Sequence, residues 1–189
     1  MGSTPTPRKN PLFFLLSRCA WLSKVGLLLG LVAAPAALAQ VPLVHLSCLL
    51  GHESITYTPG LTFTAALDTA VASNATFGLC TSTTGSIIDS GTATLQGLGK
   101  LSCLGGNASG LQTIRWNTGT TSTFQYSASS TIIGVTNIIQ MTGTVVTGEF
   151  AGATAIETVI VQSPGLSSCL GLGGLTQASG SVSITILSL

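Results

Sequence analysis

Charged residues are scarce in this chain: only 6% of its 189 residues are Asp, Glu, Lys or Arg. Four of the six basic residues precede position 25, so residues 40–189 hold two, Lys100 and Arg115, against five acidic residues, a formal charge of −3. Binding to nucleic acid or to an acidic membrane surface requires clusters of Lys and Arg. The sequence therefore argues against both partners.

Histidine is rarer still, with only His45 and His52. A Ser-His-Asp triad would have to use one of them, and the chain has no G-x-S-x-G nucleophile elbow. His52-Glu53 lacks the second histidine of an HExxH zinc site, and "GLGK" (97–100) lacks the Ser or Thr of a phosphate loop. We therefore expect no catalytic residue, no metal and no cofactor.

Two acidic residues, Glu149 and Glu157, flank the small-residue run "FAGA" and are the candidates for glycoside hydrolysis, which needs two opposed carboxyl groups. Glu157 is the more conspicuous, because it lies within the apolar run "AIETVIV". The alternative is a solvent-facing residue at a sheet edge, where charge discourages aggregation. Charged side chains are seldom buried, so we predict this edge position for Glu157 and treat hydrolysis as the least favoured function.

The first 39 residues have the three parts of a secretory signal peptide. Basic residues precede the apolar run "VGLLLGLV" (25–32), and "AAPAALAQ" follows it. Ala37 and Ala39 fit the small-x-small pattern, which places cleavage between Ala39 and Gln40. The alternative, an uncleaved membrane anchor, would need about 20 apolar residues. We therefore expect residues 40–189 to form one secreted, extracellular domain.

Four cysteines remain beyond the predicted signal, at Cys48, Cys80, Cys103 and Cys169. An even number in an exported chain predicts two disulfides. Zinc ligands usually come in closely spaced pairs, whereas the gaps here are 32, 23 and 66 residues. Four cysteines allow three pairings, and spacing alone does not choose among them; we favour the sequential one, Cys48–Cys80 with Cys103–Cys169.

Alternation of apolar and hydroxyl side chains runs through the chain beyond the signal. It is clear in "LTFTAAL" (61–67) and in "SVSITIL" (181–187), and 131–146 reads as a strand bent or broken near Gly134. Such alternation is typical of strands with one apolar and one polar face. With Gly and Pro between the runs, it predicts an all-β fold, a single antiparallel β-sandwich or β-barrel of about eight or nine strands.

The stretch "IRWNTGTTSTFQY" (114–126) reads as a β-hairpin. Asn117 and Gly119 suit a tight turn, and the aromatic residues on either side alternate with polar ones. Burial of these aromatics in the core is the interpretation we favour. The alternative is a barrel mouth in which they contact a small apolar ligand, with the candidate contacts Trp116, Phe124, Tyr126 and Tyr57.

Three segments, "WNTGTTSTFQY" (116–126), "GTVVTGEFAGATAIETVIV" (143–161) and "GGLTQASGSVSITIL" (173–187), together resemble a family of small exported proteins of actinobacteria. The resemblance implies an all-β fold with few cysteines, no assigned activity and no catalytic residue to transfer. "GEFAGA" (148–153) also resembles turns of lipocalin-like and allene-oxide-cyclase-like barrels, which adds weight to a barrel over a sandwich.

The sequence leaves three functions in order of preference. The first is an exported, disulfide-stabilised structural or interaction module without catalysis, whose hydroxyl-rich faces contact cell-envelope polysaccharide or a second copy of the chain. The second is a β-barrel that binds a small apolar ligand. The third is a hydrolase that uses Glu149 or Glu157.

Overall fold

The computed structural model of the protein describes residues 43–83, 85, 87–133, 136–162 and 166–188. The predicted signal segment and its cleavage site between Ala39 and Gln40 lie outside these residues. Eight strands and one short helix make up the described part: β1 (Leu43–Leu61), β2 (Leu67–Ser82), β3 (Gly91–Ser102), β4 (Gly105–Trp116), β5 (Thr121–Ile133), β6 (Thr136–Gly148), β7 (Thr154–Gln162), α1 (Leu166–Leu170) and β8 (Leu175–Ser188).

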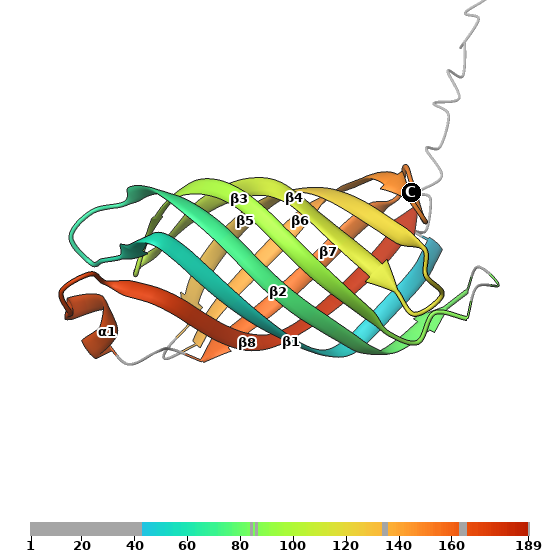
Figure 1. Cartoon of the computed structure of the whole chain (residues 1–189), viewed down its shortest axis with the longest axis horizontal. Helices are drawn as coiled ribbons and strands as arrows, with labels where there is room; N and C mark the ends of the chain where they lie inside the picture. Colours follow the sequence, from blue (N-terminus) through green and yellow to red (C-terminus); the bar gives the residue numbers. More distant parts are fainter. Residues whose placement is uncertain (1–42, 84, 86, 134–135, 163–165, 189) are drawn as a thin grey trace, which may run out of the picture. The chain divides into compact units, whose positions relative to one another are not determined.

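The strands form a closed antiparallel barrel in sequence order (Figure 1). Each strand pairs with the next one, and β8 pairs with β1, for example Ser54 with Ser179, to close the ring. The predicted all-β fold is confirmed, and the choice left open between sandwich and barrel is resolved as a barrel. Closure gives every strand two neighbours, so the described sheet has no free edge.

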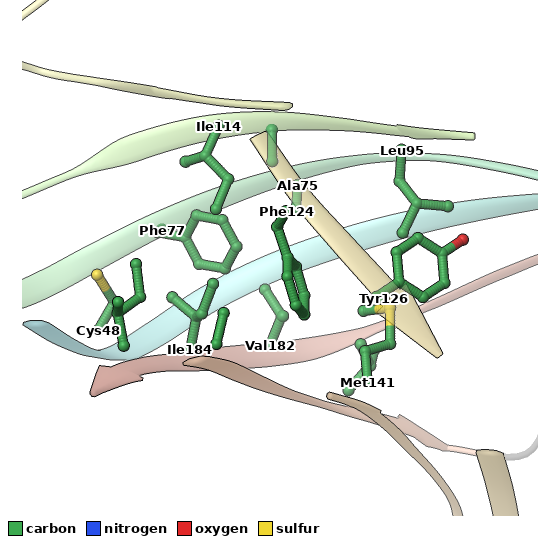
Figure 2. Close-up of a cluster of buried hydrophobic side chains, with 14 of the residues drawn as sticks. Cys48, Ala75, Phe77, Leu95, Ile114, Phe124, Tyr126, Met141, Val182 and Ile184 are labelled. Atoms are coloured by element: carbon green, nitrogen blue, oxygen red, sulfur yellow. The ribbon is translucent and has the colours of Figure 1, made fainter. Parts of the chain in front are cut away.

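The alternation seen in the sequence separates the interior of the barrel from its outer surface. Val182, Ile184 and Ile186 of β8 are at most 2% exposed and point inward. Figure 2 shows this core along the barrel, from Cys48 at one end, past Phe124, to Tyr126 and Met141 toward the other. Thr and Ser occupy most intervening positions, so the solvent-facing side is rich in hydroxyl groups.

One predicted strand, 61–67, is a connection and not a strand. β1 continues past Pro59 and Gly60 to Leu61, and the chain then leaves the sheet until β2 begins at Leu67. In the connection, the Thr62 carbonyl accepts a hydrogen bond from the Cys103 amide in the β3–β4 turn. The alternation of the sequence does not produce alternating burial there, since Ala65 and Leu67 are exposed, and the Thr62 carbonyl bonds to a turn and not to a neighbouring strand. The predicted bend or break near Gly134 lies outside the described residues, after β5 ends at Ile133 and before β6 begins at Thr136.

Both disulfides have the sequential pairing that we favoured. Cys48 and Cys80 are directly opposite in the β1–β2 ladder, with Cα atoms 3.9 Å apart. The Cys103–Cys169 bond, with Cα atoms 6.2 Å apart, joins the β3–β4 turn to α1 in the β7–β8 connection. In a ring of eight strands these two connections lie on opposite sides, so this disulfide spans the end of the barrel. We call this end, which also carries the β1–β2 connection, the α1 end.

The predicted hairpin at 114–126 is present as β4 and β5. The Trp116 amide donates to the Thr120 carbonyl, and Gly119 adopts a φ of 87° in the turn. Ile114, Trp116, Phe124 and Tyr126 are all at most 3% exposed, which confirms that the aromatics lie in the core. No helix in the described ranges is both apolar enough and long enough to span a membrane.

Candidate ligand site at the α1 end of the barrel

Of the six buried polar or charged side chains in the described residues, four lie together inside the barrel among apolar ones. They are nearly inaccessible, with exposed fractions of 1% for Glu53, 4% for Ser73, 0% for Gln112 and 0% for Glu157. Each occupies an inward position of its strand: Glu53 alternates with Ile55 on β1, as Glu157 does with Val159 on β7. The pleat of the strand therefore carries a polar group into the core at these positions. We call these four residues the polar cluster.

Only part of the polar cluster is hydrogen-bonded. Gln112 Nε2 on β4 donates to Glu157 Oε1 on β7 at 3.2 Å. Glu53 Oε2, Glu157 Oε2, Gln112 Oε1 and Ser73 Oγ are buried and have no hydrogen-bond partner. A buried polar atom without a partner is unfavourable by about 1–3 kcal/mol, so four such atoms close together need a structural or functional reason.

Burial has the largest effect on the pKa values of the two carboxyl groups, Glu53 and Glu157. It raises the pKa of Glu53 above its ordinary value of 4.5, while the nearby Ser73 hydroxyl, which lacks good hydrogen-bond geometry, opposes this by favouring the charged form. The pKa of Glu157 is raised further, by burial first and then by the negative charge of Glu53, against a smaller opposing effect of Gln112. Each carboxyl thus disfavours ionisation of the other.

Two tyrosines extend the cluster toward the α1 end. Burial, followed by the charge of Glu53, raises the pKa of Tyr57 on β1 to about 12. The pKa of Tyr126 on β5 is also raised to about 12, by burial and then by Glu53 and Glu157. The Tyr126 hydroxyl packs against Gly97 on β3, where any side chain would occupy its place. Both phenols are therefore neutral hydrogen-bonding groups at physiological pH.

A cavity of about 60 Å³ opens from the polar cluster toward the α1 end. Glu53 lines it together with an apolar wall that includes Ile55, Leu95, Met141 and Val159 and with the rings of Tyr57 and Tyr126. Half-buried Ser130 and Asn137, close to the ends of β5 and β6 that meet at the α1 end, also line the cavity, which opens toward this end. This volume accommodates a few water molecules or the end of a small organic molecule.

The predicted ligand contacts divide into two pairs. Tyr57 and Tyr126 both line the cavity, as the ligand-binding alternative requires. Phe124 is 0% exposed and fills the middle of the barrel beside Tyr126, with ring centroids 6.0 Å apart (Figure 2). Trp116 lies farther from the cavity, where its Nε1 donates to Ser122 Oγ at 2.9 Å. The structure therefore does not gather the four aromatics in one mouth.

The predicted edge position of Glu157 is wrong. β7 pairs with both β6 and β8, and the side chain is 0% exposed in the interior. Glu149, its proposed partner in hydrolysis, lies in the β6–β7 turn and bonds through its backbone to Thr121 and Ser122. The carboxyl that interacts with Glu157 is Glu53, which we had considered only beside His52.

The alternation of side chains along the sequence already indicates the inward positions of the polar cluster. Glu53 keeps the alternation of Ile55 and Tyr57, and Gln112 keeps that of Ile114 and Trp116. A polar residue in phase with inward apolar neighbours points into the core, whatever its own preference. The exposed His52 faces outward while Glu53 faces inward, so the two cannot act as one site. In the described part of the chain, no three His, Cys, Asp or Glu side chains are grouped to hold a metal ion.

In comparisons with protein-family models, curated proteins and solved structures, the chain has no significant match. The function must therefore be argued from the geometry of the barrel.

Proposed function

We propose that the protein is an exported, disulfide-stabilised binding protein without catalysis, which holds one end of a small molecule at the α1 end of its barrel. One observation carries the proposal: Glu53, a buried acid with an unpaired oxygen, lines a cavity that opens to solvent. Ligand sites are typically concave, mainly apolar and equipped with a few polar groups that fix orientation.

Export is supported by the two intramolecular disulfides, which are typical of an oxidising compartment. The signal-like residues 1–39 and the resemblance to exported actinobacterial proteins point in the same direction. We therefore also propose that the chain belongs to that family.

Hydrolysis is less well supported by the same geometry. A glycosidase needs two carboxyl groups on opposite sides of the scissile bond. Only Glu53 of the two interior carboxyls lines the cavity, and a volume of about 60 Å³ leaves no room for a sugar ring between them. Glu157 has its Oε1 engaged by Gln112 and is 0% exposed.

An interaction module without a small ligand is the second candidate, and the outer surface favours it. The described residues place few charged side chains on this outer surface. Lys100 and Asp68 form an exposed pair at 3.9 Å, and Arg115 is exposed on β4. Weak charge repulsion permits close contact between hydroxyl-rich sheet surfaces, either with polysaccharide or with a second copy of the chain. Sedimentation over a concentration series tests self-association, which a constant monomer mass would rule out.

The binding proposal is tested by native mass spectrometry of protein purified from culture medium, followed by NMR titration with small apolar and amphiphilic molecules. We expect mass that is lost on denaturation, or shifts at Tyr57 and Tyr126. Ala128→Leu narrows the cavity and should weaken binding, while Ala72→Leu on the exposed face of β2 should not. Absence of extra mass and of shifts with every probe would refute the binding function.

A further inference from the structure

The barrel interior contains two acidic side chains without a basic partner. Glu53 and Glu157 are both inside, while the described Lys and Arg side chains, Lys100 and Arg115, are exposed. Buried carboxylates in proteins are normally paired with a cation or kept neutral. The histidines do not supply the cation either: His52 is exposed, and the ring of His45 lies 6.3 Å from Phe150 at the other end of the barrel.

Of the two carboxyls, Glu53 is the one that a ligand can reach. It lines the cavity with Oε2 unpaired, whereas Glu157 lies behind the wall and accepts a hydrogen bond from Gln112. Among the described lining residues, Glu53 is the one with an acidic side chain, and none is Lys, Arg or His. A group that enters this cavity therefore meets an acceptor and no positive charge.

The chemistry of the wall selects for a particular kind of group. An ammonium group offers three hydrogen-bond donors and a positive charge, which match an unpaired carboxylate oxygen and repel nothing in the lining. The rings of Tyr57 and Tyr126 add favourable cation–π faces. A carboxylate or phosphate would face Glu53 with like charge, and an alcohol would form only an uncharged hydrogen bond.

We propose that this cavity binds the protonated head of a small primary amine, with Glu53 as its counter-ion and the rings of Tyr57 and Tyr126 beside it. The inference rests on the proposed binding function and narrows its ligand class. The volume of about 60 Å³ takes the ammonium group and the first carbons. The remaining apolar chain would pass Leu61, Leu101 and Ile139 toward the α1 end, near half-buried Ser130 and Asn137.

Binding of a cation should be coupled to loss of a proton from the site. The groups that face Glu53 are Glu157 on β7 and the hydroxyls of Ser73, Tyr57 and Tyr126 on β2, β1 and β5. Both tyrosines stay neutral up to about pH 12, so the carboxyl pair is the group that titrates below that. Affinity for an amine should therefore rise with pH as this pair ionises.

The test compares three probes of similar shape, n-hexylamine, 1-hexanol and hexanoate, by calorimetry and NMR titration at pH 8. We expect the amine to bind at least tenfold more tightly than the alcohol, and hexanoate not to bind. Titrating hexylamine in two buffers of different ionisation enthalpy, at several pH values from 5 to 8, should reveal proton release from the unmodified protein where the carboxyl pair is still protonated. Glu53→Gln should remove the preference for the amine over hexanol, whereas Glu149→Gln, in the distant β6–β7 turn, should leave the amine-to-alcohol ratio of the original protein.

Each outcome separates this inference from the function on which it rests. Equal or tighter binding of hexanol, or an amine preference that persists in folded Glu53→Gln, would overturn the amine proposal and leave the binding function intact. If none of the three probes binds, both are refuted. Should Glu53→Gln fail to fold, the amine-to-alcohol ratio and the proton release of the unmodified protein still decide the question.

Discussion

Gln112 Nε2 and Glu157 Oε1 lie 3.2 Å apart inside the barrel, in a hydrogen bond that joins β4 to β7 across the interior. The two strands are not neighbours, because β5 and β6 separate them along the sheet. The bond therefore fixes opposite walls at the level of the polar cluster. It also holds Glu157 in place behind Glu53, so that the charge of each acts on the other.

Replacing Gln112 with Leu should lower the free energy of unfolding by about 1–3 kcal/mol. The substitution keeps the side chain about the same size but removes the hydrogen-bond donor of Glu157 Oε1, whose side chain is 0% exposed. Urea denaturation measures the effect. Gln125→Leu is the matched control, because Gln125 is exposed on β5, and it should change stability by less than about 0.5 kcal/mol.

Stability should fall as pH rises above about 4.5. Glu53 and Glu157 have raised pKa values in the folded protein, so between the unfolded value of 4.5 and the folded values the native state binds more protons than the unfolded one. Their favourable contribution is complete below pH 4.5 and is lost as pH rises through the folded pKa values. Each group adds a slope of at most about 1.4 kcal/mol per pH unit.

Glu53→Gln with Glu157→Gln should flatten this dependence, measured as the midpoint of urea denaturation between pH 4 and pH 8. Asp68→Asn with Glu149→Gln changes the same number of charges outside the polar cluster and should keep the slope of the original protein. If the double Glu→Gln variant retained that slope, the interior carboxyls would not be its source.

Gly97→Ala should displace Tyr126 and disturb the cavity. A methyl group at Gly97 would overlap the Tyr126 hydroxyl and come within 2.8 Å of the Ser109 carbonyl oxygen. We expect a loss of about 1–3 kcal/mol in stability, as for other overpacked sites, together with a changed NMR signal of Tyr126. Gly78→Ala on β2 is the control, since the nearest atom to its methyl group would be 3.5 Å away. Equal effects of the two variants would contradict this account.

The fold was more accessible from the sequence than the site was. The alternation around Val182 and Ile184 and the hairpin turn at Asn117–Gly119 are local patterns, and local patterns predict strands and turns. Whether the sheet closes depends on the pairing of β1 with β8, which lie more than a hundred residues apart in the chain. Without closure, an acid such as Glu157 is naturally assigned to an edge; with closure, it has only an interior or an exterior to occupy.

The cavity could not be predicted because it depends on residues that meet only across the barrel. Glu53 on β1 and Tyr126 on β5 belong to opposite walls, and nothing in their separate segments indicates that they line one space. The aromatic pattern correctly indicated that the rings are buried, but it did not indicate where each ring lies along the barrel axis. Trp116 and Phe124 therefore fill the core, while Tyr57 and Tyr126 reach the cavity.

Removal of each of the two disulfides should loosen a different part of the barrel. Cys48–Cys80 joins strands that are already paired by backbone hydrogen bonds, whereas Cys103–Cys169 joins a turn to α1 across the end of the barrel. Double replacement by Ala should lower the free energy of unfolding by about 2–5 kcal/mol in either case. Only the loss of Cys103–Cys169 should speed hydrogen exchange in α1 and at the backbone amide of residue 103, which donates to the Thr62 carbonyl.

Hydrogen-exchange mass spectrometry of both double variants measures this difference directly. Cys48→Ala with Cys80→Ala serves as the control for the loss of one disulfide, and it should leave exchange at the α1 end unchanged. Because Cys103–Cys169 spans the end at which the cavity opens, its removal should also speed the entry of any ligand that binds beside Glu53. Equal exchange at the α1 end in the two variants would show that the Cys103–Cys169 bond does not hold this end of the barrel together.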